Sequence, residues 1–256
     1  MGILQRGLVL CLALVAPVLW AQASRHNEAA SGLPIEAERL FALANQARAA
    51  QGVGSLQWDP ALAAAALQHC QRMAAEGPIS HRYGGEPDLT ARASQAGAHF
   101  SLIEENVALG SNPALIHQGW MNSPGHRSNL LSPEVDRVGI AVVASNGVLY
   151  AVADYARAVQ VRSQAQVEAA VANLLHARGL TILKDAAGAR AYCANGTKDT
   201  SQPSFLMRWE NPDLTQLPQP LMDRLGQYRQ AAVGSCAPQE VEGAFTTYRV
   251  AVLLYY

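Results

Sequence analysis

The run Val135-Asp-Arg-Val-Gly-Ile-Ala-Val-Val-Ala-Ser-Asn-Gly-Val-Leu-Tyr-Ala-Val-Ala-Asp-Tyr-Ala156 decides the fold class of the first half of the chain. Residues 135–144 and 148–156 are rich in β-branched and aromatic side chains, a composition typical of strands. Asn146 and Gly147 between them both tolerate a positive φ, which a type I′ turn requires. The run therefore predicts a β-hairpin.

Toward the N-terminus, the spacing of hydrophobic residues is mostly about 3.6, which is typical of helices, and one segment has the spacing of two that is typical of a strand. Helices are predicted over residues 35–50, 60–76, 88–97, 113–121 and 126–131. Between the third and fourth of these, residues 101–109 alternate with a period of two, which places Glu105 in one row with Ile103 and Val107. A carboxylate thus interrupts an apolar face of a predicted strand.

Beyond a seam near residues 158–163, the chain starts again with a helix. Ser163 and Gln166 have the spacing of a capping box, and Gly179 ends that helix. Strands are predicted over residues 204–209, 228–233 and 247–254, with a helix over 219–225. The last strand is apolar on both faces, which favours a central position in a sheet. We find no internal repeat, and this half is predicted to be a smaller α+β domain.

The first residues have the layout of a cleaved signal peptide. Arg6 precedes an apolar run of about 14 residues, Gly7 to Trp20, and small residues follow. An uncleaved membrane anchor is the alternative, but a span needs roughly 20 residues and Pro17 interrupts this run. We expect a secreted or periplasmic protein that is not an integral membrane protein after cleavage. The expected divisions are 1–23 signal peptide, 24–34 linker, 35–158 first domain and 159–256 C-terminal domain.

The charge and the cysteine content of the chain limit the possible partners and disulfide bonds. The net charge is −1 with no lysine or arginine cluster, so the sequence does not support a nucleic-acid partner. Removal of Cys11 with the signal leaves three cysteines for an oxidising compartment. Cys193 and Cys236, both in the C-terminal half, are the economical disulfide pair, worth roughly 4 kcal/mol on chain-entropy grounds. Cys70, in a helical pattern, is expected to be a buried free thiol.

Three polar residues from separate elements are the candidates for chemistry: His81, Glu105 and His126. A buried carboxylate needs donors or a cation beside it, and two imidazoles could serve. If the three converge, they match a zinc site with an open position, or a metal-free network that moves protons. The spacing alone does not show convergence. The alternative is an exposed histidine, a salt-bridged glutamate and a helix-terminal histidine with no shared role.

Several motifs in order resemble the CAP superfamily, which holds cysteine-rich secretory, antigen 5 and pathogenesis-related 1 proteins. They cover about residues 35–158 and are similar to its bacterial branch of SCP-like extracellular proteins. The motifs are Asn45-Gln-Ala-Arg48, Leu56-Gln-Trp58-Asp59-Pro60-Ala-Leu62, Ser80-His81, Glu105-Asn106-Val107-Ala108, Trp120-Met-Asn-Ser123-Pro-Gly-His126-Arg-Ser-Asn129 and Arg137-Val-Gly139-Ile.

The resemblance implies an α-β-α sandwich with a cleft that holds two histidines and two glutamates, sometimes with a divalent metal such as zinc. His81, Glu105 and His126 fill three of these positions, as the expected catalytic or metal-binding cluster. Ser123 stands where the family has its second glutamate, which removes a negative charge and puts metal affinity and glutamate-dependent hydrolysis in doubt. Asn106 and Asn129 are expected neighbours of the cleft.

The favoured function is a secreted binding protein whose cleft holds a lipid, glycan or peptide ligand. A metal- or histidine-dependent extracellular hydrolase is the alternative, and a third interpretation places the function in the C-terminal half. Ser123 and His126 invite a nucleophile-base interpretation, but no oxyanion-hole motif accompanies them. His69 lies on an apolar helix face and is expected to be a hydrogen-bonded packing residue.

Overall fold

The computed structural model describes residues 35–184, 186–196, 202–237 and 245–256. The expected signal peptide and linker, residues 1–34, lie outside the described residues. Among the described helices, none is both long enough and apolar enough to cross a bilayer.

The first half is built on a four-stranded sheet with the strand order β1-β3-β4-β2. The strands are β1 (Gln57–Trp58), β2 (Phe100–Gly110), β3 (Arg137–Ser145) and β4 (Val148–Ala158). β1 runs parallel to β3, and the other pairs are antiparallel. The predicted hairpin is confirmed, with φ of 50° at Asn146 and 78° at Gly147. β2, which carries Glu105, is an edge strand.

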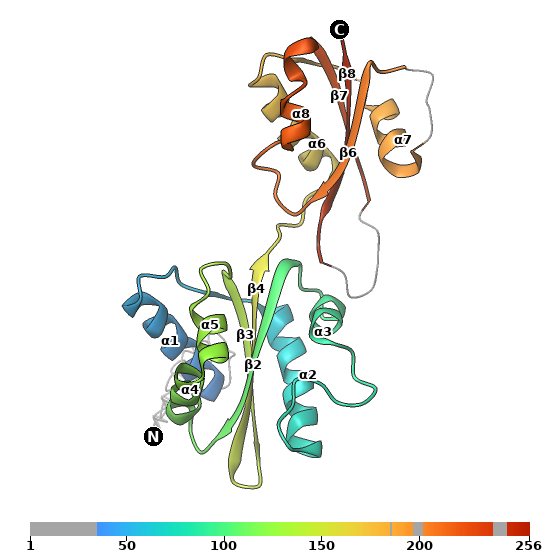
Figure 1. The fold of residues 1–256 in the computed structure, drawn as a ribbon. Coiled ribbons are helices and arrows are strands. Elements are labelled where there is room, and N and C mark those ends of the chain that lie inside the picture. Colours follow the sequence, from blue (N-terminus) through green and yellow to red (C-terminus); the bar gives the residue numbers. More distant parts are fainter. Residues whose placement is uncertain (1–34, 185, 197–201, 238–244) are drawn as a thin grey trace, which may run out of the picture. The chain divides into compact units, whose positions relative to one another are not determined.

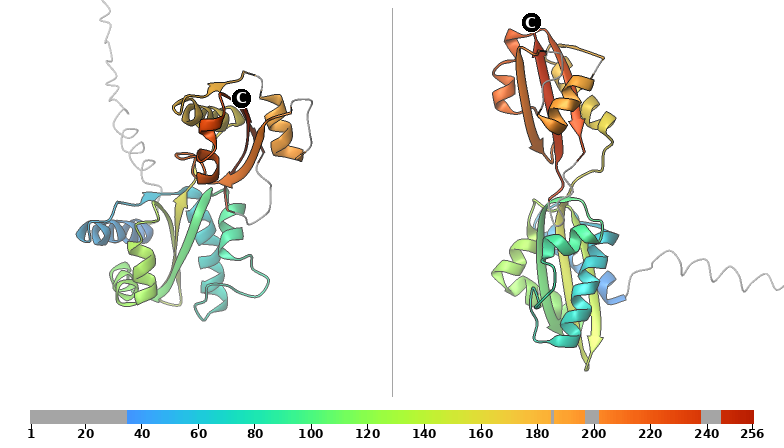
Figure 2. Two further views of the ribbon diagram at one scale, coloured as in Figure 1. Left: turned by 45° about the horizontal axis from the view of Figure 1, so that its top comes forward. Right: turned by 90° about the vertical axis from the view of Figure 1, so that its right-hand side faces the viewer.

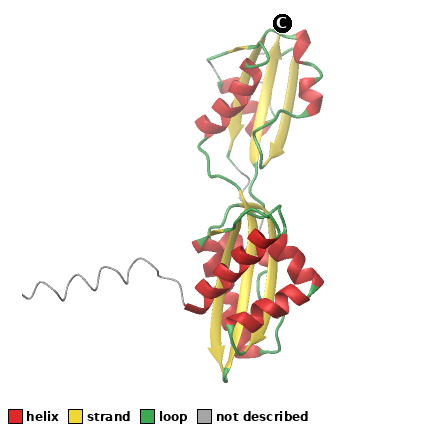
Figure 3. Cartoon of the chain, turned by 90° about the vertical axis from the view of Figure 1, so that its left-hand side faces the viewer, coloured by secondary structure: helices red, strands yellow, loops and turns green. Residues whose placement is uncertain are grey.

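Helices cover both faces of this sheet, which confirms the expected α-β-α sandwich (Figures 1 and 3). One face packs against α1 (Ile35–Ala50), α4 (Pro113–Asn122) and α5 (Pro124–Leu131), and the other against α2 (Pro60–Glu76) and α3 (Leu89–Gln95). As predicted, Asp59 caps α2 by accepting from two backbone amides. α2 approaches the sheet closely at Gly139, where a Cβ atom would lie 2.0 Å from the amide nitrogen of Ala63.

A buried cation ties the α1 layer together. The Arg48 side chain is 1% exposed, and it donates to the carbonyl oxygens of Gly54, Leu130, Ser132 and Val135 at 2.6 to 3.1 Å. Two of these carbonyls belong to the C-terminal end of α5, where the helix dipole favours a cation. Arg48 therefore helps to hold α5, and with it His126, against α1.

The second half has its own sheet with the order β5-β7-β8-β6. Its strands are β5 (Thr181–Ile182), β6 (Phe205–Asn211), β7 (Gln230–Cys236) and β8 (Tyr248–Tyr255), and β8 is central, as predicted. α7 (Ala187–Asn195) covers one face, and α6 (Gln164–His176) and α8 (Gln219–Met222) cover the other (Figures 1 and 2). The capping box of α6 is confirmed. The predicted helix over 219–225 is divided into α8 and a 3-10 turn, Leu225–Gln227, and α7 and β5 were not predicted.

Both cysteine expectations are confirmed. Cys193 and Cys236 form a disulfide with 5.6 Å between their Cα atoms. Cys70 is a buried free thiol, and burial raises its pKa to about 12. At that pKa the thiol stays protonated at neutral pH, which makes it a packing group rather than a nucleophile.

Candidate functional site

The structure brings His81 and Glu105 together. His81 lies in the loop between α2 and α3, and its Nδ1 atom is 2.8 Å from Oε1 of Glu105. The Glu105 side chain is 3% exposed, whereas that of His81 is 60% exposed. The hydrogen bond to Glu105 is the largest effect on the pKa of His81 and raises it, against an opposing contribution from burial. The site therefore offers solvent an imidazole that a buried carboxylate orients.

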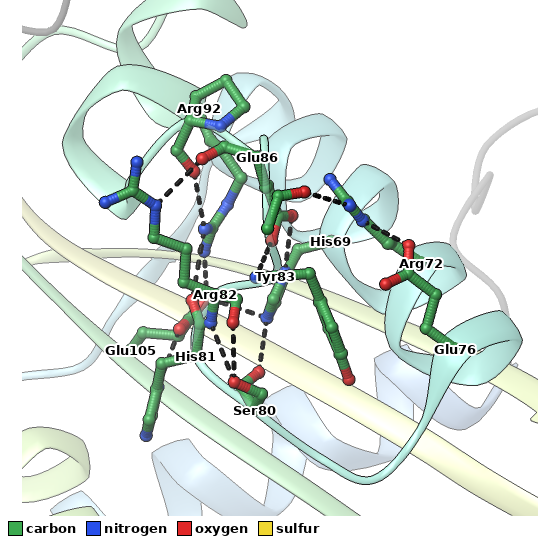
Figure 4. A network of polar contacts seen from close by, with 12 residues as sticks. His69, Arg72, Glu76, Ser80, His81, Arg82, Tyr83, Glu86, Arg92 and Glu105 are labelled. Carbon is green, nitrogen blue, oxygen red and sulfur yellow. Dashed lines mark hydrogen bonds and ion pairs between the residues drawn. The ribbon is translucent and has the colours of Figure 1, made fainter.

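Arg92 on α3 is the main partner of Glu105, and sequence reasoning missed it. Its Nη2 atom donates to Oε2 of Glu105, and both side chains are 3% exposed (Figure 4). Its Nη1 atom also donates to the carbonyl oxygens of His81 and Pro87. One guanidinium thus neutralises the buried acid and holds the loop that carries His81.

A second buried pair of a basic and an acidic residue, His69 and Glu86, lies beside the pair of Arg92 and Glu105. His69 on α2 is fully buried; its Nδ1 atom is 2.7 Å from Oε1 of Glu86, and its Nε2 atom is 2.8 Å from the carbonyl oxygen of Ser80 (Figure 4). Because both ring nitrogens face acceptors, only the doubly protonated ring donates at both ends. Burial raises the pKa of Glu86, but hydrogen bonds from His69 and the Tyr83 amide outweigh it, so the pKa lies below its usual range. His69 is therefore a hydrogen-bonded packing residue, as expected.

Asp154 is a further acid of this cluster that the sequence analysis did not identify. It stands directly opposite Glu105 in the register of β2 and β4, and it is 0% exposed. No donor from the described residues reaches either of its carboxyl oxygens. Burial, and then the charge of Glu105, raise the pKa of Asp154 well above its ordinary value. Asp154 therefore favours its protonated form more strongly than an ordinary carboxyl group does.

His126 is held on the other side of the edge strand. Asn106 points to the α5 face of β2 and donates from Nδ2 to the carbonyl oxygen of His126 at 2.9 Å. Asn129 of α5 donates to Oδ1 of Asn106 at 3.0 Å and to the carbonyl oxygen of Glu105 at 3.2 Å. These contacts dock α5 on the free edge of β2, and they give both expected cleft neighbours a positioning role.

Within the described part of the chain, the ring of His126 makes no hydrogen bond to Glu105 or His81. Burial lowers the pKa of His126, and the charge of His81 lowers it further, so the two rings are electrostatic neighbours. One ring is therefore favoured as a charged donor and the other as a neutral acceptor. His81 and Glu105 are in direct contact, whereas the shared site with His126 stays a prediction.

Ser123 marks the junction of α4 and α5. Its side chain makes no capping hydrogen bond, and its backbone amide donates to the carbonyl oxygens at the end of α4. A cavity of about 540 Å³ lies at this junction, and its lining includes Met121, Pro124, Arg127 and Leu131. His126, Glu105 and His81 do not line this cavity, which lies against the face of α5 formed by Pro124, Arg127 and Leu131.

The donor set does not fit a divalent metal in this arrangement. Arg92 and His81 occupy the two oxygens of Glu105, and Ser123 replaces the second acid. Within the described ranges, no group of three or more histidine, cysteine, aspartate or glutamate side chains is placed to hold an ion. A guanidinium on a carboxylate competes with a cation for the same oxygen, so a metal would have to displace Arg92 or bind without Glu105. Zinc binding itself stays a prediction.

Known proteins are similar to the first half of the chain. Residues 41–155 match the family model described as "CAP: Cysteine-rich secretory protein family". An uncharacterized protein of Bacillus subtilis, YkwD, is 28% identical over 137 residues, which is 52% of this chain and 52% of that protein. The membrane protein YlbC of the same organism, also uncharacterized, is 31% identical over 110 residues, 41% of this chain and 31% of that protein. The chain thus spans about half or less of these relatives.

Two solved structures are also similar. One is an extracellular protein of Bacillus anthracis that contains an SCP domain, with 28% identity and a TM-score of 0.45, covering 48% of this chain and 40% of that one. The other is a cysteine-rich secretory protein of Staphylococcus aureus, with 21% identity and a TM-score of 0.42, covering 50% of this chain and 40% of that one.

Proposed function

Because residues 41–155 form a domain of the cysteine-rich secretory protein (CAP) family, we propose that the chain is an exported binding protein whose site surrounds His81, Glu105 and His126. Export is supported by the signal-peptide layout of the first residues. The ligand is a lipid, glycan or peptide with a polar group that hydrogen-bonds to the two imidazoles.

The observation that carries this proposal is the contrast in exposure within one hydrogen bond. A 60% exposed imidazole is anchored to a carboxylate that is 3% exposed. That carboxylate is held in turn by Arg92. Such a chain fixes the ring before a ligand arrives, so less rotamer entropy is lost on binding. A structural ion pair alone would not need an exposed member.

The pKa values of the two histidines shift in opposite directions, and this difference suggests which chemical groups the site binds. The pKa of His81 is raised and that of His126 is lowered, so between these values one ring donates and the other accepts. A hydroxyl, amide or carboxyl group can satisfy both. The hydrolase alternative needs a nucleophile beside a base, and the Ser123 hydroxyl has no hydrogen bond to His126 among the described contacts.

The test is an NMR titration of the histidine ring signals of the full exported chain. The probes are phosphatidylglycerol vesicles, an N-acetylglucosamine tetramer and tetra-alanine, and zinc chloride is titrated separately. We expect one organic probe to shift the His81 and His126 signals together, and His81→Gln to weaken its binding about tenfold, equivalent to about 1.4 kcal/mol. His176→Gln, an exposed histidine at the end of α6, is the matched control and should change nothing.

Binding of an acceptor group should also depend on pH. The protonated His81 ring is the donor, and its raised pKa extends that form above the usual value of 6.5. Affinity is therefore expected to be highest below about pH 6.5 and to fall as the pH rises through the folded-state pKa. If no organic probe moves either ring, or if His81→Gln binds as well as wild type, the proposed site is wrong. A response to zinc alone would favour a metal site instead.

A further inference from the structure

The two halves of the chain share one topology. In each, a helix, a two-residue strand and a second helix precede an edge strand, helical segments and a closing pair of antiparallel strands, and the first half has α3 in addition before its edge strand. The sheets have the orders β1-β3-β4-β2 and β5-β7-β8-β6, with the same parallel and antiparallel pairs. α2 and α7 each cover the face opposite the first helix (Figure 1).

The registers of the two sheets can be superposed residue by residue. β1 pairs Trp58 with Val138, and β5 pairs Ile182 with Ala231. From this starting point, each set of residues that pair across neighbouring strands in one sheet corresponds to such a set in the other. The row Glu105, Asp154 and Gly139 corresponds to Leu206, Leu253 and Ala232.

Contacts outside the strands follow the same correspondence. The Cys70 thiol donates to the carbonyl oxygen of Tyr150 at 3.2 Å, and Cys193 Sγ lies 3.4 Å from the carbonyl oxygen of Arg249. Tyr150 and Arg249 are both four residues before the corresponding pair Asp154 and Leu253. This agreement was not used to align the sheets, so it supports the alignment independently.

From these matches we infer that residues 164–255 are a second copy of the fold of residues 35–158, in which apolar side chains replace the two acids of the charged cluster. Leu206 and Leu253 occupy the positions of the two acids and pack with α7. Residues 196–204 join α7 to β6, whereas residues 77–99, which include α3 and Arg92, join α2 to β2. The second copy thus has leucines at the positions of the two acids, and its connection between these elements is nine residues long, against twenty-three in the first copy.

This inference places the polar site in one copy only. The second copy closes the same face with leucines, a buried alanine and the bonded Cys193. A ligand that the first copy recognises through charged and polar groups therefore has no equivalent subsite in the second. The inference stands on backbone register and does not depend on the proposed function.

The correspondence makes a definite prediction for a disulfide in the first copy. Cys193 matches Cys70, and Cys236, two residues after Gly234, matches Val143, two residues after Ala141. Val143 packs against the cluster that contains Cys70, and its backbone lies within hydrogen-bonding reach of the thiol. Val143→Cys should therefore bond to Cys70 when the chain is exported to an oxidising compartment.

The readout is thiol titration of the denatured full chain, with peptide mapping before reduction. Val143→Cys is expected to lose both free thiols and to yield a cross-linked peptide. Val142→Cys, whose side chain packs on the α1 face, is the matched control and should keep both. Free thiols in a folded Val143→Cys chain, or equal bonding in the control, would overturn the inference.

A second variant tests the same inference if the Val143→Cys chain does not fold. Arg92→Leu/Glu105→Leu/Asp154→Leu gives the first copy the apolar pair that the second copy uses. If the copies share one fold, this variant folds with an unchanged or higher Tm, and hydrogen exchange in β2 and β4 stays slow. Loss of protection in those strands would count against the shared fold.

Discussion

Replacing Arg92 with leucine is expected to lower the free energy of unfolding of the first half by about 3–5 kcal/mol. Arg92 and Glu105 are each 3% exposed, so the change leaves a buried carboxylate without its cation. Asp154, directly opposite, offers a second acid instead of a compensating charge. The loss of the bonds to the His81 and Pro87 carbonyl oxygens also releases the loop that carries His81.

Hydrogen exchange in β2 and β4 under increasing urea measures this loss in the intact chain. Arg157→Leu is the matched control because Arg157 pairs with Glu134 on the surface, where both side chains are about half exposed, and it should cost less than about 1 kcal/mol. Arg92→Leu/Glu105→Leu should recover most of the stability, since it removes both charges. An Arg92→Leu chain as stable as the Arg157→Leu chain would contradict a structural role for this pair.

The Arg92–Glu105 ion pair illustrates which part of the site can be predicted from the sequence and which part cannot. Period two along residues 101–109 placed Glu105 on an apolar row, and the structure shows it buried there. The same pattern contains no information about the partner, because α3 reaches β2 only through tertiary packing. The motifs pointed to histidines, yet a guanidinium is the main counterion.

Asp154 could have been found from the sequence with one more step. The Asn146-Gly147 turn sets the hairpin register, which pairs Asp154 with Gly139 in a run that is otherwise apolar. An acid in such a run is a signal of burial. Its position opposite Glu105, however, depends on the pairing of β2 with β4, a long-range contact that no turn specifies.

The second half was harder to predict for a different reason. β1 and β5 have two residues each, too few to show a period. α7 begins at Ala187 and contains Gly188, which lowers its helix propensity. The shared topology was invisible because the corresponding positions differ in chemistry, with Glu105 and Asp154 against Leu206 and Leu253. Register, rather than residue identity, relates the two halves.

Asp154→Asn is expected to remove a pH dependence from the stability of the first half. The carboxyl pKa is raised by burial and by Glu105, so the folded chain keeps a proton that the unfolded chain releases above about pH 4. Stability is therefore full below that pH and falls as the pH rises toward the folded-state pKa. The slope is about 1.4 kcal/mol for each pH unit and ends at that pKa.

The asparagine variant keeps the shape and offers Glu105 an amide N–H in place of the acid proton, without the cost of holding that proton. The difference in unfolding free energy between Asp154→Asn and wild type should therefore widen in favour of the variant as the pH rises from 4. Urea unfolding at several pH values, followed by exchange in β4, gives this difference directly. Asp136→Asn, which removes an exposed acid from the same half, is the control variant. Parallel stability curves for wild type and Asp154→Asn would mean that Asp154 is ionised in the folded chain, and the charge balance of the cluster would then need a cation beyond Arg92.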